Sequence, residues 1–107
     1  MIRFATVALG LVLSTSALAE NAGVEVSQLQ TVRLVNGIET ITGMAQNNSG
    51  KKLSNVFVKF NVYDQNGNTV GNTIAHVTDL EAGASWKFQA PYPGPFAKFK
   101  VTEIQTF

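Results

Sequence analysis

Apolar and polar residues alternate along most of the chain after its first 20 residues. The alternation is clearest over residues 53–64, where Val56, Val58, Phe60 and Val62 fall on one face and Asn55, Lys59 and Asn61 on the other. A period of two is typical of a β-strand with one buried face and one solvated face. No window of about a dozen residues carries a capped apolar stripe of helical period. The pattern therefore predicts an all-β domain.

Turn signals divide this pattern into six or seven short strands. The expected strands cover residues 24–35, 38–46, 53–64, 69–78, 84–90 and 96–104. Asn36-Gly37 between the first two predicts a type I′ hairpin turn, since both central positions of that turn require positive φ. Gly71 indicates a β-bulge. Strands of this length and spacing predict an antiparallel immunoglobulin-like β-sandwich rather than a closed barrel.

The large apolar residues predict the core of this sandwich. A domain of this size buries only about two thirds of its unfolded surface, so each large side chain counts. The aromatic residues expected to pack are Phe57, Phe60, Trp86, Phe88 and Phe99. Trp86 is expected to be the largest core residue of its strand, and Phe99 and Val101 are expected to face inward from the last one.

The first 19 residues predict a cleaved secretory signal peptide. A basic start at Arg3 precedes an apolar run over residues 4–13, and Ser16-Ala17-Leu18-Ala19 provides small residues before Glu20. This order is typical of signal peptides cleaved after an A-x-A site. The apolar run is shorter than the roughly 20 residues that span a bilayer. We therefore expect cleavage after Ala19, a single domain over residues 20–107 with no membrane anchor, and a periplasmic or secreted location.

Composition narrows the partners of the mature domain. The 107-residue chain is 45% hydrophobic and 14% charged, and cleavage would leave seven basic and seven acidic residues. A net charge of zero gives no electrostatic basis for binding nucleic acid. The chain has no cysteine, which excludes disulfides and a lipid attached to an N-terminal cysteine. The packed core alone must hold the domain together.

The segment Asp64-Gln65-Asn66-Gly67-Asn68 offers a choice between a calcium loop and a hairpin turn. Asp64, Asn66 and Asn68 match ligand positions 1, 3 and 5 of an EF-hand loop, but Thr69 stands at the glycine position and Ala75 at the bidentate glutamate position. A hairpin explains the same residues, because Asp64 can form an Asx turn and Gly67 can supply the left-handed residue. We favour the turn and predict no metal site and no cofactor.

Residues for catalysis are few. His76 is the only histidine, and without a second histidine or a cysteine it cannot complete a zinc site. Ser54 or Ser85 could pair with His76 only through the fold, and no G-x-S-x-G motif accompanies them. The carboxylates lie on separate elements. We expect a surface histidine and no enzymatic activity.

Four aromatic residues are candidates for partner binding. Phe57 and Tyr63 are large residues on the polar face of their strand, where they either cover the sheet edge or form a ligand platform. Tyr92 and Phe96 lie in the segment of residues 90–96, which holds all three prolines. This segment is expected to be a stiff loop. Aromatic anchors on a stiff loop lose little entropy on binding. The alternative for Phe96 is packing in the core.

One stretch also resembles a known family. "FNVYD", residues 60–64, resembles the F-x-L-Y-D signature of the FxLYD domain family, with Val62 in place of leucine. "ITGMAQNNSGKKLSNVFVKF" and "LEAGASWKF" are similar to the segments that flank that signature in the family, and the resemblance covers residues 41–104. It implies a bacterial, exported, immunoglobulin-like β-sandwich module without known enzymatic activity, and it carries over no catalytic residue.

Two function hypotheses follow. The first is a binding or adaptor module that recognises a protein partner, with a glycan as the less favoured ligand, through a loop or a sheet edge. The second is a structural or self-assembling envelope component in which an edge strand, such as the one ending at residues 104–107, pairs with another chain.

Overall fold

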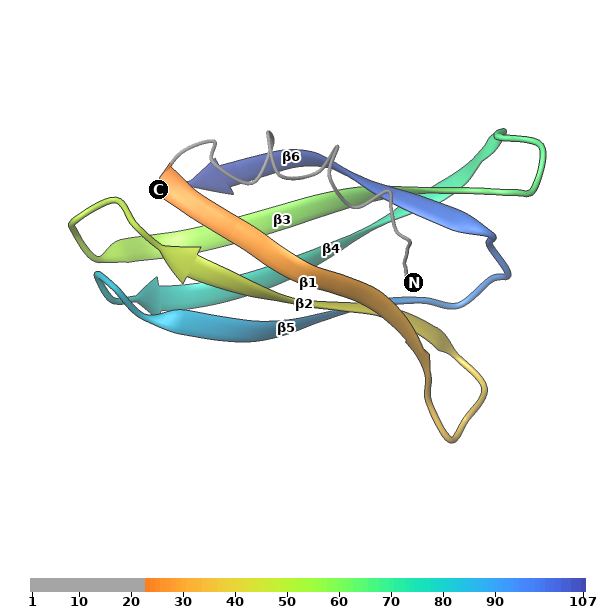
Figure 1. The fold of residues 1–107 in the computed structure, drawn as a ribbon, viewed down its shortest axis with the longest axis horizontal. Helices are drawn as coiled ribbons and strands as arrows, with labels where there is room; N and C mark the ends of the chain where they lie inside the picture. Colours follow the sequence, from red (N-terminus) through yellow and green to blue (C-terminus); the bar gives the residue numbers. More distant parts are fainter. Residues whose placement is uncertain (1–22) are drawn as a thin grey trace, which may run out of the picture.

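Two antiparallel three-stranded sheets pack face to face in the computed structural model, which describes residues 23–107 (Figure 1). The strands are β1 (Val24–Arg33), β2 (Glu39–Asn47), β3 (Leu53–Tyr63), β4 (Thr69–Leu80), β5 (Ser85–Tyr92) and β6 (Lys98–Thr106). This confirms the predicted all-β sandwich. The expected signal peptide and its cleavage site lie outside the described residues. In the described part of the chain, no helix has the length and apolar character needed to span a membrane.

The strand order places three loops at one end of the sandwich. One sheet has the order β1-β2-β5 and the other β4-β3-β6, with every neighbouring pair antiparallel. Hairpins join β1 to β2 and β3 to β4, and the other connections cross between the sheets. The loops of residues 34–38, 64–68 and 93–97 therefore lie together at one end, and the remaining two loops lie at the other (Figure 1).

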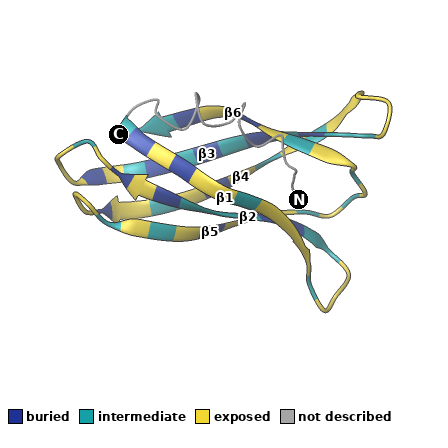
Figure 2. Ribbon diagram, in the orientation of Figure 1, coloured by how far each residue is buried: buried dark blue, intermediate teal, exposed yellow. Residues whose placement is uncertain are grey.

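The core forms between the inner faces of the two sheets (Figure 2). Phe60 from β3 and Phe88 from β5 are its two large aromatic residues, with ring centroids 5.9 Å apart. Gly43 makes room for Phe88, because a Cβ at position 43 would lie 2.6 Å from Cζ of that ring. Trp86 also faces inward but is only half-buried, since β5 is an edge strand. The expectation that Trp86 is the largest core residue of this strand was therefore wrong, and Phe88 takes that position.

Two other aromatic residues that were expected to pack in the core lie on opposite sides of the β4-β3-β6 sheet. Phe99 packs against the core from β6, and Val101 is fully buried, as expected. Phe57 is not a core residue. It pairs with His76 and Gln105 on the outer side of its sheet, because the alternation of β3 gives the inner side to Val56 and Val58.

Three irregularities interrupt the ladders. A bulge was expected at Gly71, and the extra residue is its neighbour Val70. Val62 pairs with Gly71 and Tyr63 with Thr69, so Val70 has no partner on β3. In β6, Thr102 is the extra residue opposite β3. In β1 the register shifts between Ser27 and Gln30, where Gln28 has a positive φ of 57°.

Asn47 joins the two sheets at the end opposite the three loops. Its side chain is completely buried. Nδ2 donates to the carbonyl oxygens of Lys51 at 2.7 Å and Leu80 at 2.9 Å, and Oδ1 accepts from the backbone and hydroxyl of Ser49 at 3.0 and 2.7 Å. One amide thus satisfies groups from the 47–52 turn and from the end of β4. The polar turn was expected, but the buried position of Asn47 was not.

The strand ends differ from the sequence pattern near the prolines. Pro91 and Tyr92 belong to β5, where they pair with Thr40 and Glu39 of β2. Because β5 is an edge strand, Pro91 is tolerated there without a donor on the open side. The loop is correspondingly shorter than expected, and Phe96 lies within it rather than in β6.

Candidate functional site

The four candidate aromatic residues separate into two groups. Phe57 and Tyr63 stand on the outer side of β3. Tyr92 and Phe96 lie close together where the chain leaves β5, with ring centroids 5.8 Å apart in an edge-to-face arrangement. The structure therefore does not bring all four into one site.

Tyr92 connects the two sheets. Its hydroxyl donates to the carbonyl oxygen of Val70 on β4 at 2.8 Å, and its ring lies over Gly71, where a Cβ would collide with it. Beside it, the Thr73 hydroxyl donates to the carbonyl oxygen of Pro91 at 2.7 Å. Tyr92 and Phe96 are both partly buried against the core. The hydroxyl and ring of Tyr92 are thus already engaged within the molecule.

Phe57 forms a different kind of cluster on the solvent side of the β4-β3-β6 sheet. Its ring stacks on that of His76 with centroids 4.2 Å apart and planes 4° apart, and Phe107 meets it edge-on at 5.9 Å. Cross-strand pairing places His76 opposite Phe57. Backbone hydrogen bonds of Phe107 with Ser54 and Asn55, at 2.9 and 3.0 Å, fix the last residue against β3.

We call the outer surface formed by Phe57, Ile74, His76 and Phe107 the aromatic face. Ile74 is 43% exposed and Phe107 68% exposed, although both are apolar. The interior behind this surface is already filled by the buried side chains of β3, so the core does not require apolar residues here. Scattered exposed apolar residues are common in proteins, whereas a contiguous group on one face is typical of an interaction site.

Polar groups border the aromatic face. Asn55 Oδ1 lies 2.9 Å from Nε2 of His76. Lys59 and Glu103 form an ion pair of 3.5 Å beside Ile74. An apolar centre with a polar rim is the usual anatomy of a protein interface.

Sequence reasoning identified Phe57 as a binding candidate but missed the other three members of this face, since His76 was expected only to be a surface histidine. Ile74 lies in a strand whose alternation is weak, and its outward direction follows only from its pairing with Lys59. Phe107 is the final residue, and its contact with Phe57 depends on β6 lying beside β3. Tyr63 belongs to the same side of β3 but pairs with Thr69 and Lys98 at the far end.

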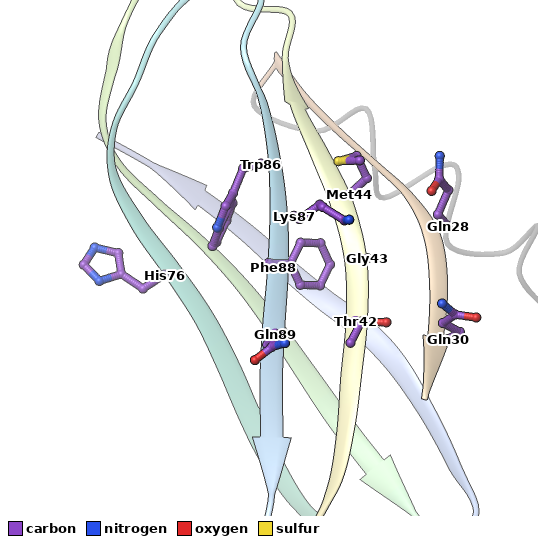
Figure 3. Close-up of a pocket in the computed structure, with 10 residues that line it drawn as sticks. All are labelled: Gln28, Gln30, Thr42, Gly43, Met44, His76, Trp86, Lys87, Phe88 and Gln89. Carbon is purple, nitrogen blue, oxygen red and sulfur yellow. The ribbon is translucent and has the colours of Figure 1, made fainter. Parts of the chain in front are cut away.

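A hollow of ≈ 620 Å³ lies on the other sheet (Figure 3). Its lining residues from β1 and β2 are Gln28, Gln30, Thr42, Gly43 and Met44, and those from β5 and β4 are Trp86, Lys87, Phe88, Gln89 and His76. None of these residues is a carboxylate. His76 and Lys87 stand on opposite sides of β5 (Figure 3). This lining does not bring together an acid and a base that could share a substrate.

Asp64 closes the 64–68 loop as an Asx turn. One carboxylate oxygen accepts from the backbone N–H groups of Asn66 and Asn68, both at 2.9 Å, and the other accepts from Asn68 Nδ2 at 3.3 Å. The hydrogen bond from the Asn68 backbone is the main reason that the pKa of Asp64 is lowered. Within residues 23–107, no three His, Cys, Asp or Glu side chains are grouped so that they could hold a metal ion.

Comparison with protein-family models, with curated protein sequences and with solved structures gave no match to this chain.

Proposed function

We propose that this chain is an exported, non-catalytic binding module that recognises a protein partner through its aromatic face. The observation that carries the proposal is the stacked cluster of Phe57, His76 and Phe107 on a solvent-facing sheet surface. The cluster holds its aromatic rings in fixed positions before any partner binds. Rigid aromatic anchors lose little entropy on association, which is why such residues are enriched in interfaces.

The form of the face favours a protein over a small molecule. Small ligands bind in concave sites that surround most of their surface. A hollow of ≈ 570 Å³ lies beside Ile74, but Phe57, His76 and Phe107 are not among the residues that line it. The stacked rings stand on neighbouring strands outside this hollow, with the Lys59–Glu103 ion pair nearby. Such a surface can be covered by another protein surface, and the neighbouring charges would set orientation more than affinity.

Export and family membership belong to the same proposal. The N-terminal pattern of a signal peptide supports export to the periplasm or the outside of the cell. The resemblance of residues 41–104 to FxLYD domains supports an immunoglobulin-like module without enzymatic activity.

Self-assembly through the edge strand β6 is the second candidate, and the features of that strand oppose it. Thr102 forms a bulge, and Lys98 and Lys100 are exposed along the strand. Bulges and lysines are the means by which natural edge strands avoid pairing with other chains. We therefore place recognition by the aromatic face first.

Photo-crosslinking tests the proposal directly. A crosslinking amino acid at position 74, on the aromatic face, is expected to capture one protein in the cells that produce the chain. The same residue at position 46, which is exposed on the outer side of β2, is the control and is expected to capture none above background. Equal capture at both positions would contradict a specific face.

Affinity measurements with the purified captured protein provide the second step. Ile74→Lys is expected to raise Kd at least tenfold, because it replaces an apolar member of the face by a cation and adds that charge opposite Lys59. This side chain is 43% exposed on edge strand β4, so the variant should remain folded. Lys87→Ala on the opposite sheet is the control. An unchanged Kd for Ile74→Lys would exclude the aromatic face as the binding surface.

A further inference from the structure

The two hairpin loops at one end of the sandwich share one backbone structure. In the 34–38 loop, Leu34 N donates to Ile38 O at 3.0 Å and Gly37 N to Leu34 O at 2.8 Å. In the 64–68 loop the same two bonds join Asp64 to Asn68 at 2.9 Å and Gly67 to Asp64 at 3.1 Å. The φ angles of Gly37 and Gly67 are 85° and 84°.

This geometry is a type I turn followed by a left-handed glycine, not the expected type I′ turn. Asn36 and Asn66 do not have positive φ, as a type I′ turn would require. In the described chain, the non-glycine residues with positive φ are Gln28 and Asp79. A three-residue hairpin loop with a left-handed residue at its end is a common alternative to the two-residue turn. The Asn-Gly pair thus sets the same loop twice.

The two loops share their Asn-Gly pair but differ in chemistry at the other three positions. Residues 64–68 are Asp-Gln-Asn-Gly-Asn, whereas residues 34–38 are Leu-Val-Asn-Gly-Ile. Val35 is fully exposed, and Val32 at the base of the hairpin is 40% exposed. The polar loop proves that this backbone does not need aliphatic residues. The fully exposed Val35 therefore requires an explanation outside the turn, whereas Leu34 and Ile38 are half-buried.

We infer that the apolar tip, defined as the fully exposed Val35 and the half-buried Leu34 and Ile38 beside it, inserts into an aliphatic pocket of a protein partner. The tip is held in place before binding, because Arg33 Nη2 pairs with Glu39 Oε1 at 3.0 Å across its base and Arg33 Nη1 donates to Gly37 O at 3.3 Å. A rigid apolar anchor surrounded by polar groups is the arrangement found at the energetic centre of protein interfaces.

The surroundings of the tip define the chemistry of the partner. The Arg33 side chain is 70% exposed, so its remaining N–H groups face acceptor oxygens at the rim of the partner's pocket. A hollow of ≈ 280 Å³ lies beside the tip, lined by Arg33, Gly37, Glu39, Gly94, Pro95 and Phe96. A partner covering the tip also covers this hollow, which brings Phe96 into the same surface.

A lipid bilayer is a poorer match for the tip. Its three aliphatic side chains contain fewer apolar carbons than one myristoyl chain, and a single myristoyl chain already binds membranes only marginally. The cation at the base of the hairpin is paired with Glu39, which reduces its attraction to anionic lipids. A shaped pocket supplies the close packing that a lipid surface does not.

The inference rests on the proposed function only in taking a protein as the partner, and the test separates the two. A crosslinking amino acid is placed at position 35, with position 65 of the matched loop as the control. The expected result is one identified protein captured from position 35 and not from position 65. Capture from position 74 without capture from position 35 would overturn the tip and leave the aromatic face, whereas no capture from either would overturn both.

Binding of the purified captured protein then decides the role of the tip. Val35→Gln copies the residue of the matched loop and is expected to raise Kd at least tenfold, whereas Gln65→Val is expected to leave Kd unchanged. An unchanged Kd for Val35→Gln would overturn the inference. So would Val35-dependent binding to vesicles of phosphatidylethanolamine and phosphatidylglycerol, or capture of a second copy of this chain.

Discussion

The hairpin loops of residues 34–38 and 64–68 have the same backbone hydrogen bonds but use their side chains differently. In the polar loop, Asp64 accepts hydrogen bonds from Asn66 and Asn68, so the side chains reinforce the turn. In the apolar loop, Asn36 Oδ1 accepts one bond from Ile38 N at 3.1 Å, and Val35 is fully exposed. Residues that the backbone does not require are the ones to examine for function.

The aromatic residues show the same contrast. Tyr92 has a structural role, because its hydroxyl donates a hydrogen bond to β4 and its ring packs on Gly71 of that strand. Phe57 stands on the outer side of a strand whose inner side already fills the core. Our proposals therefore rest on Phe57 and Val35 and not on Tyr92. The fold does not require an apolar side chain at position 57 or 35.

The loop of residues 47–52 extends this comparison and gives the largest expected effect on stability. Asn47→Ala would leave the buried carbonyl oxygen of Leu80 without this donor. It would also remove the part-buried bonds to the N–H and hydroxyl of Ser49 and one of the two donors to Lys51 O, the other being the Ser49 hydroxyl at 3.0 Å. Buried groups that lose their partner cost about 1–3 kcal/mol each, so we expect a loss of about 2–4 kcal/mol in the free energy of unfolding. Urea denaturation measures it.

Asn48→Ala is the matched control for this prediction. Asn48 is the next residue, is exposed, and makes one side-chain bond of 3.3 Å to Glu25. Exposed substitutions of this kind usually change stability by less than about 0.5 kcal/mol. Equal losses for the two variants would show that Asn47 is not the buried connection between the sheets.

Local patterns predicted the elements of this fold better than its long-range contacts. The alternation over residues 53–64 and the two Asn-Gly pairs predicted the longest hairpin and both left-handed glycines, because these depend on neighbours in sequence. The positions of Phe88, Tyr92 and Phe107 depend on which strands lie side by side. No short stretch of sequence contains that information, which is why the core role of Trp86 was overestimated and most of the aromatic face was missed.

Replacing the glycines of the two loops tests whether their backbones are equivalent. Gly37→Ala and Gly67→Ala place a Cβ on a residue with positive φ, and in both cases no atom lies within 4 Å of it. The cost is therefore conformational, about 1–2 kcal/mol in the free energy of unfolding for each variant. Gly50→Ala, with a φ of 85° and equally open surroundings, is a third instance in a different loop. Urea denaturation measures both losses. Unequal losses of stability at positions 37 and 67 would show that the two loops do not have equivalent backbones.

The smallest expected effect is a difference between the two loops in how their side chains make stability depend on pH. The pKa of Asp64 is lowered in the folded chain, chiefly by the backbone N–H of Asn68. The unfolded chain therefore takes up this proton at a higher pH, and the stabilisation is present above the unfolded pKa and lost as pH falls through the folded value. Asp64→Asn should reduce the fall in urea midpoint between about pH 6 and about pH 3.

Leu34→Asp places the same carboxylate in the apolar loop. Because the two backbones match, the N–H groups of Asn36 and Ile38 can donate to this carboxylate, whereas the side-chain amide of Asn68 has no equivalent at Ile38. The variant should therefore gain a smaller stabilisation at neutral pH, which is lost on acidification like that of Asp64. Leu34→Asn separates the charge from the turn preference. If Leu34→Asp shows no such gain relative to Leu34→Asn, the two loops differ in backbone structure, and the aliphatic residues of the apolar tip would then have an explanation within the turn itself.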